Sequence, residues 1–240
     1  MNEILEGFVR ALQLIASLDP EVLNISILSL RVSGIAVVVG SIIGLPIGTA
    51  LGLTRFSGKG VLLGIVNTLI RSTVNAFMGL PPVFAGLVIY LMLSTSGPLG
   101  PLQLLYTPTA MILVQLVMAV PIIIGVTMSA VDGVDRTIRD RALSLGATNW
   151  QLAWTIIKEA RIGILTAIVV AFGGAISEVG GIMIVGGNIR WSTRALTTAI
   201  VYETELGEFG MALALGIILI SIAFLVNLSL TYLQLKVTKR

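Results

Sequence analysis

Long apolar runs are the feature of this sequence that most restricts its fold. Runs of about 20 or more residues with almost no charged side chain recur along the chain, for example at 27–53, 108–131 and 209–235. A helix needs about 20 apolar residues to cross a bilayer, whereas barrel strands would show short segments of alternating polarity. Because only helices and closed barrels satisfy their backbone groups in lipid, the runs predict an all-α polytopic membrane protein.

The composition supports a membrane environment and excludes several kinds of chemistry. Charged residues make up 11% of the 240 residues, and the mean hydropathy is +1.02. A soluble domain usually carries about 25% charged residues. The chain contains no cysteine and no histidine, which removes thiolate chemistry, imidazole acid–base catalysis and the usual zinc sites. We expect no metal site and no nucleic-acid partner, because the placement of the net charge of +3 is explained by membrane topology.

The sequence predicts five membrane spans in a single domain over 1–240. Their ranges are 27–53, 81–93, 108–131, 162–185 and 209–235, with a polar loop over 186–207 before the last. A partly embedded helix over 61–79 precedes the second span, because Pro82 cannot lie inside one continuous helix. Residues 1–20 predict an amphipathic helix at the membrane interface, with apolar residues at helical spacing: Leu5, Phe8, Leu12 and Ile15.

Lysine and arginine are unevenly distributed between the two predicted ends of the spans. The 54–60 loop, the embedded helix, the 132–161 segment and the C-terminal tail hold 11 of the 15 basic residues. Cytoplasmic loops are rich in Lys and Arg, so these segments are predicted to lie in the cytoplasm. The N-terminus would then be outside and the C-terminus inside, in agreement with an odd number of spans.

The segment 132–161 is the most informative polar part of the chain. It predicts a helix from about Ile138, a break at Gly146, and a second, amphipathic helix that leads into the fourth span. Thr148 or Asn149 can cap that second helix. From the residues alone, a plain interfacial connection between two spans explains the segment as well as a docking function does.

The run RDRALSLGA within this segment resembles the EAA loop of bacterial and archaeal ATP-binding-cassette (ABC) importer permeases. Asp140, Arg141 and Ala142 match the Glu-Ala-Ala of that motif, and Gly146-Ala147 match its Gly-Ala. Arg141 departs from the motif, as do Lys158-Glu159, which stand where Leu-Pro is usual. The resemblance implies a cytoplasmic coupling loop that docks on a separate ATPase subunit, formed by Arg139, Asp140, Arg141, Ala142, Leu143, Ser144, Leu145, Gly146 and Ala147.

The resemblance extends over nearly the whole chain from about residue 25. The runs LPPVFAGLVIYLMLS, GPLGPLQLLYTPTAMI and GGNIRWSTRALTTAIVYET look like the oxyanion-importer permeases for tungstate, molybdate and sulfate, and most like the tungstate-specific branch. This implies a type I ABC importer permease fold, a homodimer in membrane lipid, and a location in the cell membrane of a bacterium or archaeon. It also implies an extracytoplasmic substrate-binding protein and a cytoplasmic ABC ATPase dimer that holds the ATP and Mg²⁺. The chain lacks the GxxxxGKS/T phosphate loop, so we expect a permease subunit that is not an enzyme and has no cofactor of its own.

Three residues are assigned to the translocation path: Arg71, Ser177 and Glu178. Arg71 forms a polar stripe with Asn67 and Asn75, but a helix at the interface needs such a stripe in any case. Glu178 is the acidic residue deep in a predicted span. A functional role is the default for such a residue, but a carboxylate would repel an anion, so a neutral or hydrogen-bonded structural role is preferred.

Two arginines in the predicted outer loop, Arg190 and Arg194, lie beside Trp191. They are assigned to docking of the binding protein, and receiving the anion is the alternative.

Two other functional classes stay open at this point. An ion-coupled secondary transporter or channel would contain several intramembrane charges and often inverted repeats, and the sequence shows neither. A membrane enzyme would need a cluster of catalytic or metal-binding groups. Either class would be favoured if the chain worked without an ATPase partner. The choice among tungstate, molybdate and sulfate also stays open, because selection in such systems resides mainly in the binding protein.

Overall fold

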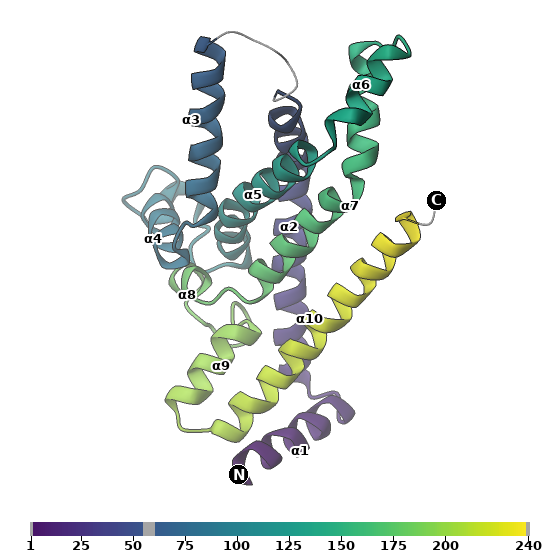
Figure 1. The fold of residues 1–240 in the computed structure, drawn as a ribbon. Coiled ribbons are helices and arrows are strands. Elements are labelled where there is room, and N and C mark those ends of the chain that lie inside the picture. Colours follow the sequence, from purple (N-terminus) through teal and green to yellow (C-terminus); the bar gives the residue numbers. More distant parts are fainter. Residues whose placement is uncertain (1, 55–60, 239–240) are drawn as a thin grey trace.

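The computed structural model describes residues 2–54 and 61–238, and within these ranges helices joined by turns and loops form the fold, with no strand (Figure 1). Four helices are long and apolar enough to cross a membrane: α2 (Pro20–Thr54), α5 (Pro108–Asp132), α7 (Asn149–Ile176) and α10 (Phe209–Thr238). A bent pair, α3 (Val61–Met78) and α4 (Pro82–Leu93), brings the number of candidate spans to as many as five. The prediction of about five membrane helices is confirmed.

The helices α2 and α5 form the centre of the bundle and pack through glycines of α2. Gly40, Gly44, Gly48 and Gly52 recur every fourth residue and are all buried. A Cβ atom on Gly44 would lie 2.8 Å from Ile123 Cγ2 of α5, and one on Gly48 would lie 2.6 Å from the Ile124 carbonyl oxygen. Because small residues let helix backbones approach closely, this stripe sets the distance between the two central helices.

The pair α3 and α4 is bent by 96° at the two prolines. Pro81 has extended backbone angles (φ −62°, ψ 128°), and α4 begins at Pro82. This confirms the prediction that the prolines divide the 61–95 stretch into two helices. α4 then packs against α8 (Gly180–Gly186), where a Cβ on Gly86 would lie 2.6 Å from Gly181 Cα.

The predicted fourth span over 162–185 is wrong in its second half. α7 ends at Ile176, and a separate short helix, α8, begins at Gly180. The Glu178 carboxylate between them accepts hydrogen bonds from the backbone N–H groups of Gly181 and Ile182, at 2.6 Å and 3.0 Å. The carboxylate thus satisfies two backbone N–H groups in the first turn of α8. The chain therefore breaks at a place where the glycines had suggested close packing within one continuous span.

The predicted polar loop over 186–207 is also wrong, because it contains helix α9 (Leu196–Glu205). Leu196 and Ala199 are buried against Leu215 and Ile218 of α10. The start of α9 is further held by the Leu196 N–H, which donates to Ser29 Oγ of α2 at 2.8 Å. The sequence did not reveal this helix because α9 is rich in polar residues, two of which, Thr197 and Thr198, are buried in the fold.

The two ends of the bundle carry different elements (Figure 1). One end holds α6 (Arg136–Ser144), the start of α7 and the start of α3, and α10 runs toward this end. The other end holds α9, the start of α10, and α1 (Asn2–Ala16), the predicted amphipathic helix. Thus α6 and the start of α7 lie at the opposite end from α1. The predicted loop over 55–60 and the basic residues Lys239 and Arg240 lie outside the described ranges. Which end faces the cytoplasm stays a prediction.

Helix α1 lies against α10 through its small residues and leaves its apolar stripe uncovered. A Cβ on Gly7 would lie 2.6 Å from Leu213 Cβ, and Ala11 is buried. The four residues of the predicted stripe are exposed: Leu5, Phe8, Leu12 and Ile15. This arrangement fits a helix at the membrane interface, as the sequence predicted.

Candidate functional site: the coupling segment and the helix break

The segment from Asp135 to Asn149 folds as two helices joined by a tight turn. The Asp135 carboxylate accepts from the Thr137 N–H at 2.9 Å and so caps α6, and this hydrogen bond lowers the pKa of Asp135. Gly146 has a φ of +79°, in the left-handed region that favours glycine. Thr148 caps α7 in a capping box with Gln151. The predicted helix–break–helix pattern is confirmed, with α6 beginning two residues before the predicted start at 138.

The inner side of this segment is anchored to the ends of the spans. Ala142 packs against a buried cluster that joins the end of α5 to the first turns of α7, formed by Val131, Leu152, Ile156 and Ala160. The Ala147 N–H also donates to the Ala142 carbonyl oxygen at 3.0 Å and closes the turn. Ala142 of α6 therefore contacts a cluster that includes residues of both α5 and α7.

The outer side of the segment exposes large apolar side chains. Leu145 is 88% exposed at the turn, and Leu143 is 43% exposed. Trp150 and Trp154 on the first turns of α7 are also exposed. Exposed apolar side chains beside Asp140 and Arg141 are typical of a surface that another protein covers.

Arg71 of α3 joins that helix to the C-terminal ends of α2 and α5. Its guanidinium forms an ion pair with Asp132, the last residue of α5, and donates to the Leu51 carbonyl oxygen of α2 at 2.6 Å. Its Nε donates to Asn67 Oδ1 at 3.1 Å, within the predicted polar stripe. Asp132 was missed by sequence reasoning, because it is separated from Arg71 by 61 residues. The arrangement gives Arg71 a structural contact, and the assignment to the path stays a prediction.

Ser177 and Glu178 are neighbours at the break between α7 and α8 but face different surroundings. Ser177 is exposed and its hydroxyl donates to the Gly173 carbonyl oxygen at 2.7 Å. Glu178 is 5% exposed, and besides capping α8 it accepts at its backbone oxygen from Thr197 Oγ1 at 2.8 Å. The preferred hydrogen-bonded role for Glu178 fits these contacts. Arg71 is not brought near this pair, since it lies at the end of α5 next to α6.

Arg190 and Arg194 meet at Glu21, in the first turn of α2. Arg190 binds Glu21 in a bidentate ion pair (2.6 Å and 2.9 Å), which raises the pKa of Arg190, and Arg194 Nη1 lies 3.5 Å from the same carboxylate. The Arg190 side chain is 60% exposed next to exposed Trp191, whereas that of Arg194 is 11% exposed and lies over the Tyr202 ring. Of the two, Arg190 is the one that a partner at this end can reach.

Besides Asp132, two further buried or partly buried groups were missed by sequence reasoning. Glu21 is 169 residues from Arg190, and no local spacing signals that pair. Gln115 of α5 is 3% exposed, and its Nε2 donates to the Ala175 carbonyl oxygen in the last turn of α7 at 2.7 Å. An amide in the middle of an apolar run was the available signal for Gln115.

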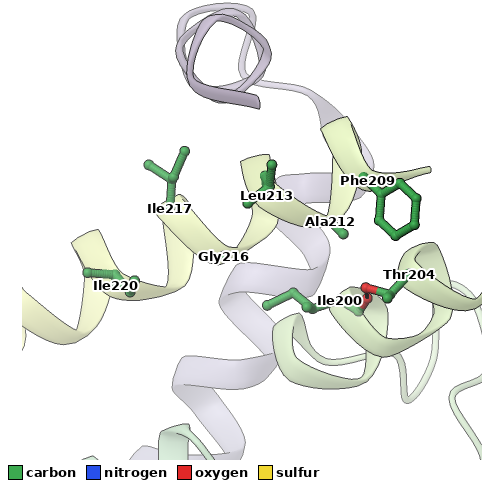
Figure 2. A pocket seen from close by; sticks show the side chains of 8 residues that line it. All are labelled: Ile200, Thr204, Phe209, Ala212, Leu213, Gly216, Ile217 and Ile220. Atoms are coloured by element: carbon green, nitrogen blue, oxygen red, sulfur yellow. Dashed lines mark hydrogen bonds between the residues drawn. The ribbon is translucent and has the colours of Figure 1, made fainter. Parts of the chain in front are cut away.

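An apolar groove of about 420 Å³ lies between α9 and α10. Figure 2 shows Ile200 and Thr204 of α9 on one side of it and residues of α10, from Phe209 to Ile220, on the other. None of the described residues that line it is charged, so it offers no group to pair with an oxyanion. Within the described ranges, no group of three acidic residues is placed to hold a metal ion.

The chain matches the model of one family, the binding-protein-dependent transport system inner membrane component, over residues 40–239. It is 44% identical over 209 residues to a probable anion ABC transporter permease protein of Haloferax volcanii, covering 85% of this chain and 87% of that protein. It is 38% identical over 234 residues to the tungstate uptake system permease protein TupB of Peptoclostridium acidaminophilum, covering 98% and 99% of the two chains.

Among solved structures, the chain is similar to the MetNI methionine ABC transporter in an inward-facing conformation. The TM-score is 0.69 at 18% identity, over 91% of this chain and 94% of that one. This likeness confirms the type I importer permease fold. With its four or five apolar membrane helices, the chain is a multi-pass inner membrane protein that belongs to the family of binding-protein-dependent transport system inner membrane components.

Proposed function

We propose that this chain is the membrane-spanning permease subunit of an ATP-driven importer and that its cargo is tungstate. The observation that carries the proposal is the similarity over 98% of the chain to a tungstate uptake permease. Molybdate and sulfate permeases also match, at 27% identity for the molybdenum permease of Azotobacter vinelandii and for the sulfate permease CysW of Escherichia coli. These two anions are therefore the alternatives that an experiment has to separate.

The proposed assembly is a homodimer of this chain with a cytoplasmic ABC ATPase dimer and an extracytoplasmic binding protein. ATP and Mg²⁺ bind to the ATPase. The exposed outer side of the segment 135–147, above all Leu145, supplies the contact with the ATPase. At the other end of the bundle, Arg190 and Trp191 are exposed and supply a contact for the binding protein.

Coupling follows from how the segment 135–147 is built into the bundle. Closure of the ATPase dimer on ATP draws the two coupling segments together. α6 is joined to α5 by three residues and packs on α7, so both helices move with α6. The glycine contact between α5 and α2, together with the Arg71 contacts, passes the displacement to α2 and α3. The helices rock, the inner gate closes and the outer gate opens toward the binding protein, and hydrolysis reverses the change.

The docking role of the coupling segment is tested by placing a charge at its most exposed apolar residue. Leu145→Glu should leave the fold intact, because the side chain is 88% exposed, and should abolish co-purification with the ATPase. Leu206→Glu is the matched control, since Leu206 is an exposed leucine (58%) at the opposite end of the bundle. Equal co-purification of the two variants would refute the assignment of this segment to the ATPase.

The cargo is tested by ATP hydrolysis in liposomes that contain the permease and its candidate ATPase. The binding protein is added empty or loaded with tungstate, molybdate or sulfate. We expect the tungstate-loaded protein to stimulate hydrolysis most strongly. Stimulation by molybdate or sulfate alone would replace the cargo, and no stimulation by any of the three would refute an oxyanion importer.

A further inference from the structure

A small, partly enclosed cavity lies where α5 meets the last turns of α7. Its volume is about 30 Å³, and most of its lining is apolar. Two polar side chains also line it, Gln115 and Glu178, which are 3% and 5% exposed. Gln115 Oε1 is buried and has no hydrogen-bond partner among the residues that the structure describes. A buried acceptor without a partner is costly, which makes this atom informative.

Both polar side chains that line the cavity carry hydrogen-bond acceptors. The Gln115 amide nitrogen already donates to the Ala175 carbonyl oxygen, which leaves Oε1 for another donor. The Glu178 carboxylate accepts from the N–H groups of Gly181 and Ile182. A carboxylate has about four acceptor positions, so Glu178 retains capacity for a further donor. An occupant of this cavity must therefore be small and must donate hydrogen bonds.

We propose that this cavity is a binding site for one ordered water molecule, which donates one hydrogen bond to Gln115 Oε1 and the other to the Glu178 carboxylate. A water needs a cavity of roughly 10–15 Å³ or more, with two to four polar partners, and the cavity provides both. A tetrahedral oxyanion is too large and offers only acceptors, so this site is separate from the passage of cargo. The water would link α5 to the carboxylate that caps α8, and it would stabilise the break between α7 and α8.

Two adjacent glycines of α7 allow a test of the site by filling it. Gly174 lines the cavity, and a Cβ there would have only Ile122 Cδ1 within 4 Å, at 3.9 Å; a Cβ on Gly173 would contact nothing within 4 Å. Both Gly→Ala changes give the same gain in helix propensity, so Gly173→Ala is the control. If the cavity holds a water, the methyl group of Gly174→Ala displaces it and leaves Gln115 Oε1 without a partner. If the cavity holds no water, the methyl group fills it favourably.

The readout is the thermal unfolding midpoint of each variant in lipid nanodiscs. We expect Gly174→Ala to unfold about 2–4 °C below Gly173→Ala, the shift that roughly 1 kcal/mol gives in a chain of this size. In a Gln115→Met background the unpartnered acceptor is absent, and the difference between the two glycine variants should disappear. A Gly174→Ala midpoint equal to or above that of Gly173→Ala in the otherwise unchanged protein would overturn the proposal.

A direct observation completes the test and does not depend on transport activity. A cryo-electron microscopy map that resolves ordered waters elsewhere should show a density peak within hydrogen-bond distance of Gln115 Oε1 and the Glu178 carboxylate. The peak should be lost in Gln115→Met. No peak in such a map would overturn the proposal, and so would an unfolding midpoint that rises with sodium but not with choline, because it would indicate a bound cation instead.

Discussion

Alanine at Gly48 should force apart the two helices that form the centre of the bundle. A Cβ atom there would lie 2.6 Å from the Ile124 carbonyl oxygen and 2.8 Å from Thr127 Cβ. The first of these neighbours is backbone and cannot rotate away, so α2 and α5 must separate locally. Gly34→Ala on the same helix is the control, because a Cβ there would contact nothing within 4 Å.

The size of the effect follows from two opposing contributions. Overpacking by one methyl group typically costs about 1–3 kcal/mol, whereas replacing Gly by Ala within a helix stabilises it by about 1 kcal/mol in water. Only the second contribution acts at Gly34. The free energies of unfolding of the two variants should therefore differ by about 1–3 kcal/mol, which corresponds to roughly 2–12 °C in unfolding midpoint for a chain of this length.

The assay is thermal unfolding of both variants in the same nanodiscs, followed by intrinsic tryptophan fluorescence. We expect Gly48→Ala to unfold below Gly34→Ala by an amount in that range. If the two midpoints coincide, the glycine stripe does not set the distance between α2 and α5, and the packing argument fails.

Three further predictions concern the ends of the helices. Arg71→Ala should lower the free energy of unfolding by about 1–3 kcal/mol, because it removes a partly buried ion pair (side chains 20% and 15% exposed) and the hydrogen bond to the Leu51 carbonyl oxygen. Arg71→Lys should recover less than half of this loss, measured by thermal unfolding, because lysine cannot bind Asp132 in the bidentate manner of arginine. Glu178→Ala should cost about 2 kcal/mol or more because two buried N–H groups lose their acceptor, while Glu178→Gln, which keeps one carbonyl oxygen, should cost less in the same assay. Gly146→Val should abolish co-purification with the ATPase while Gly146→Asn retains it, because asparagine tolerates a φ of +79° and a β-branched residue does not.

Each of these predictions has a contradicting result. Equal midpoints for Arg71→Ala and the unchanged protein would show that the contacts at the end of α5 do not stabilise the fold. Equal losses for both Glu178 variants would show that capping of α8 is not the role of the carboxylate. Retention of the ATPase by Gly146→Val would show that the turn geometry is not needed for docking.

The elements that depend on local sequence could be predicted. The apolar runs indicated the spanning helices, and Pro81-Pro82 indicated the bend between α3 and α4. Gly146 followed by Thr148 indicated the turn and the cap of α7. The bend, the turn and the cap each depend on one or two neighbouring residues, through a fixed φ, a missing N–H or a hydroxyl acceptor, and the spans depend on a continuous local run.

The elements that depend on distant contacts could not be predicted. The break at Ser177 was missed because the glycines after it fit packing within a span equally well. Only the fold shows that the Glu178 side chain accepts hydrogen bonds from the first turn of α8. Arg71 pairs with Asp132, 61 residues away, Gln115 with Ala175, 60 residues away, and Arg190 with Glu21, 169 residues away. Such pairs are set by how the helices pack, and a single sequence carries no signal of them.

The most direct test of the central claim is ATP-dependent uptake of tungstate into proteoliposomes that contain this permease and its ATPase, with the tungstate-loaded binding protein on the opposite side. The account predicts accumulation of tungstate that requires ATP, the ATPase subunit and the binding protein, and that is lost in Leu145→Glu but kept in Leu206→Glu. Accumulation without the ATPase subunit would contradict the account and would indicate an ion-coupled secondary transporter or channel.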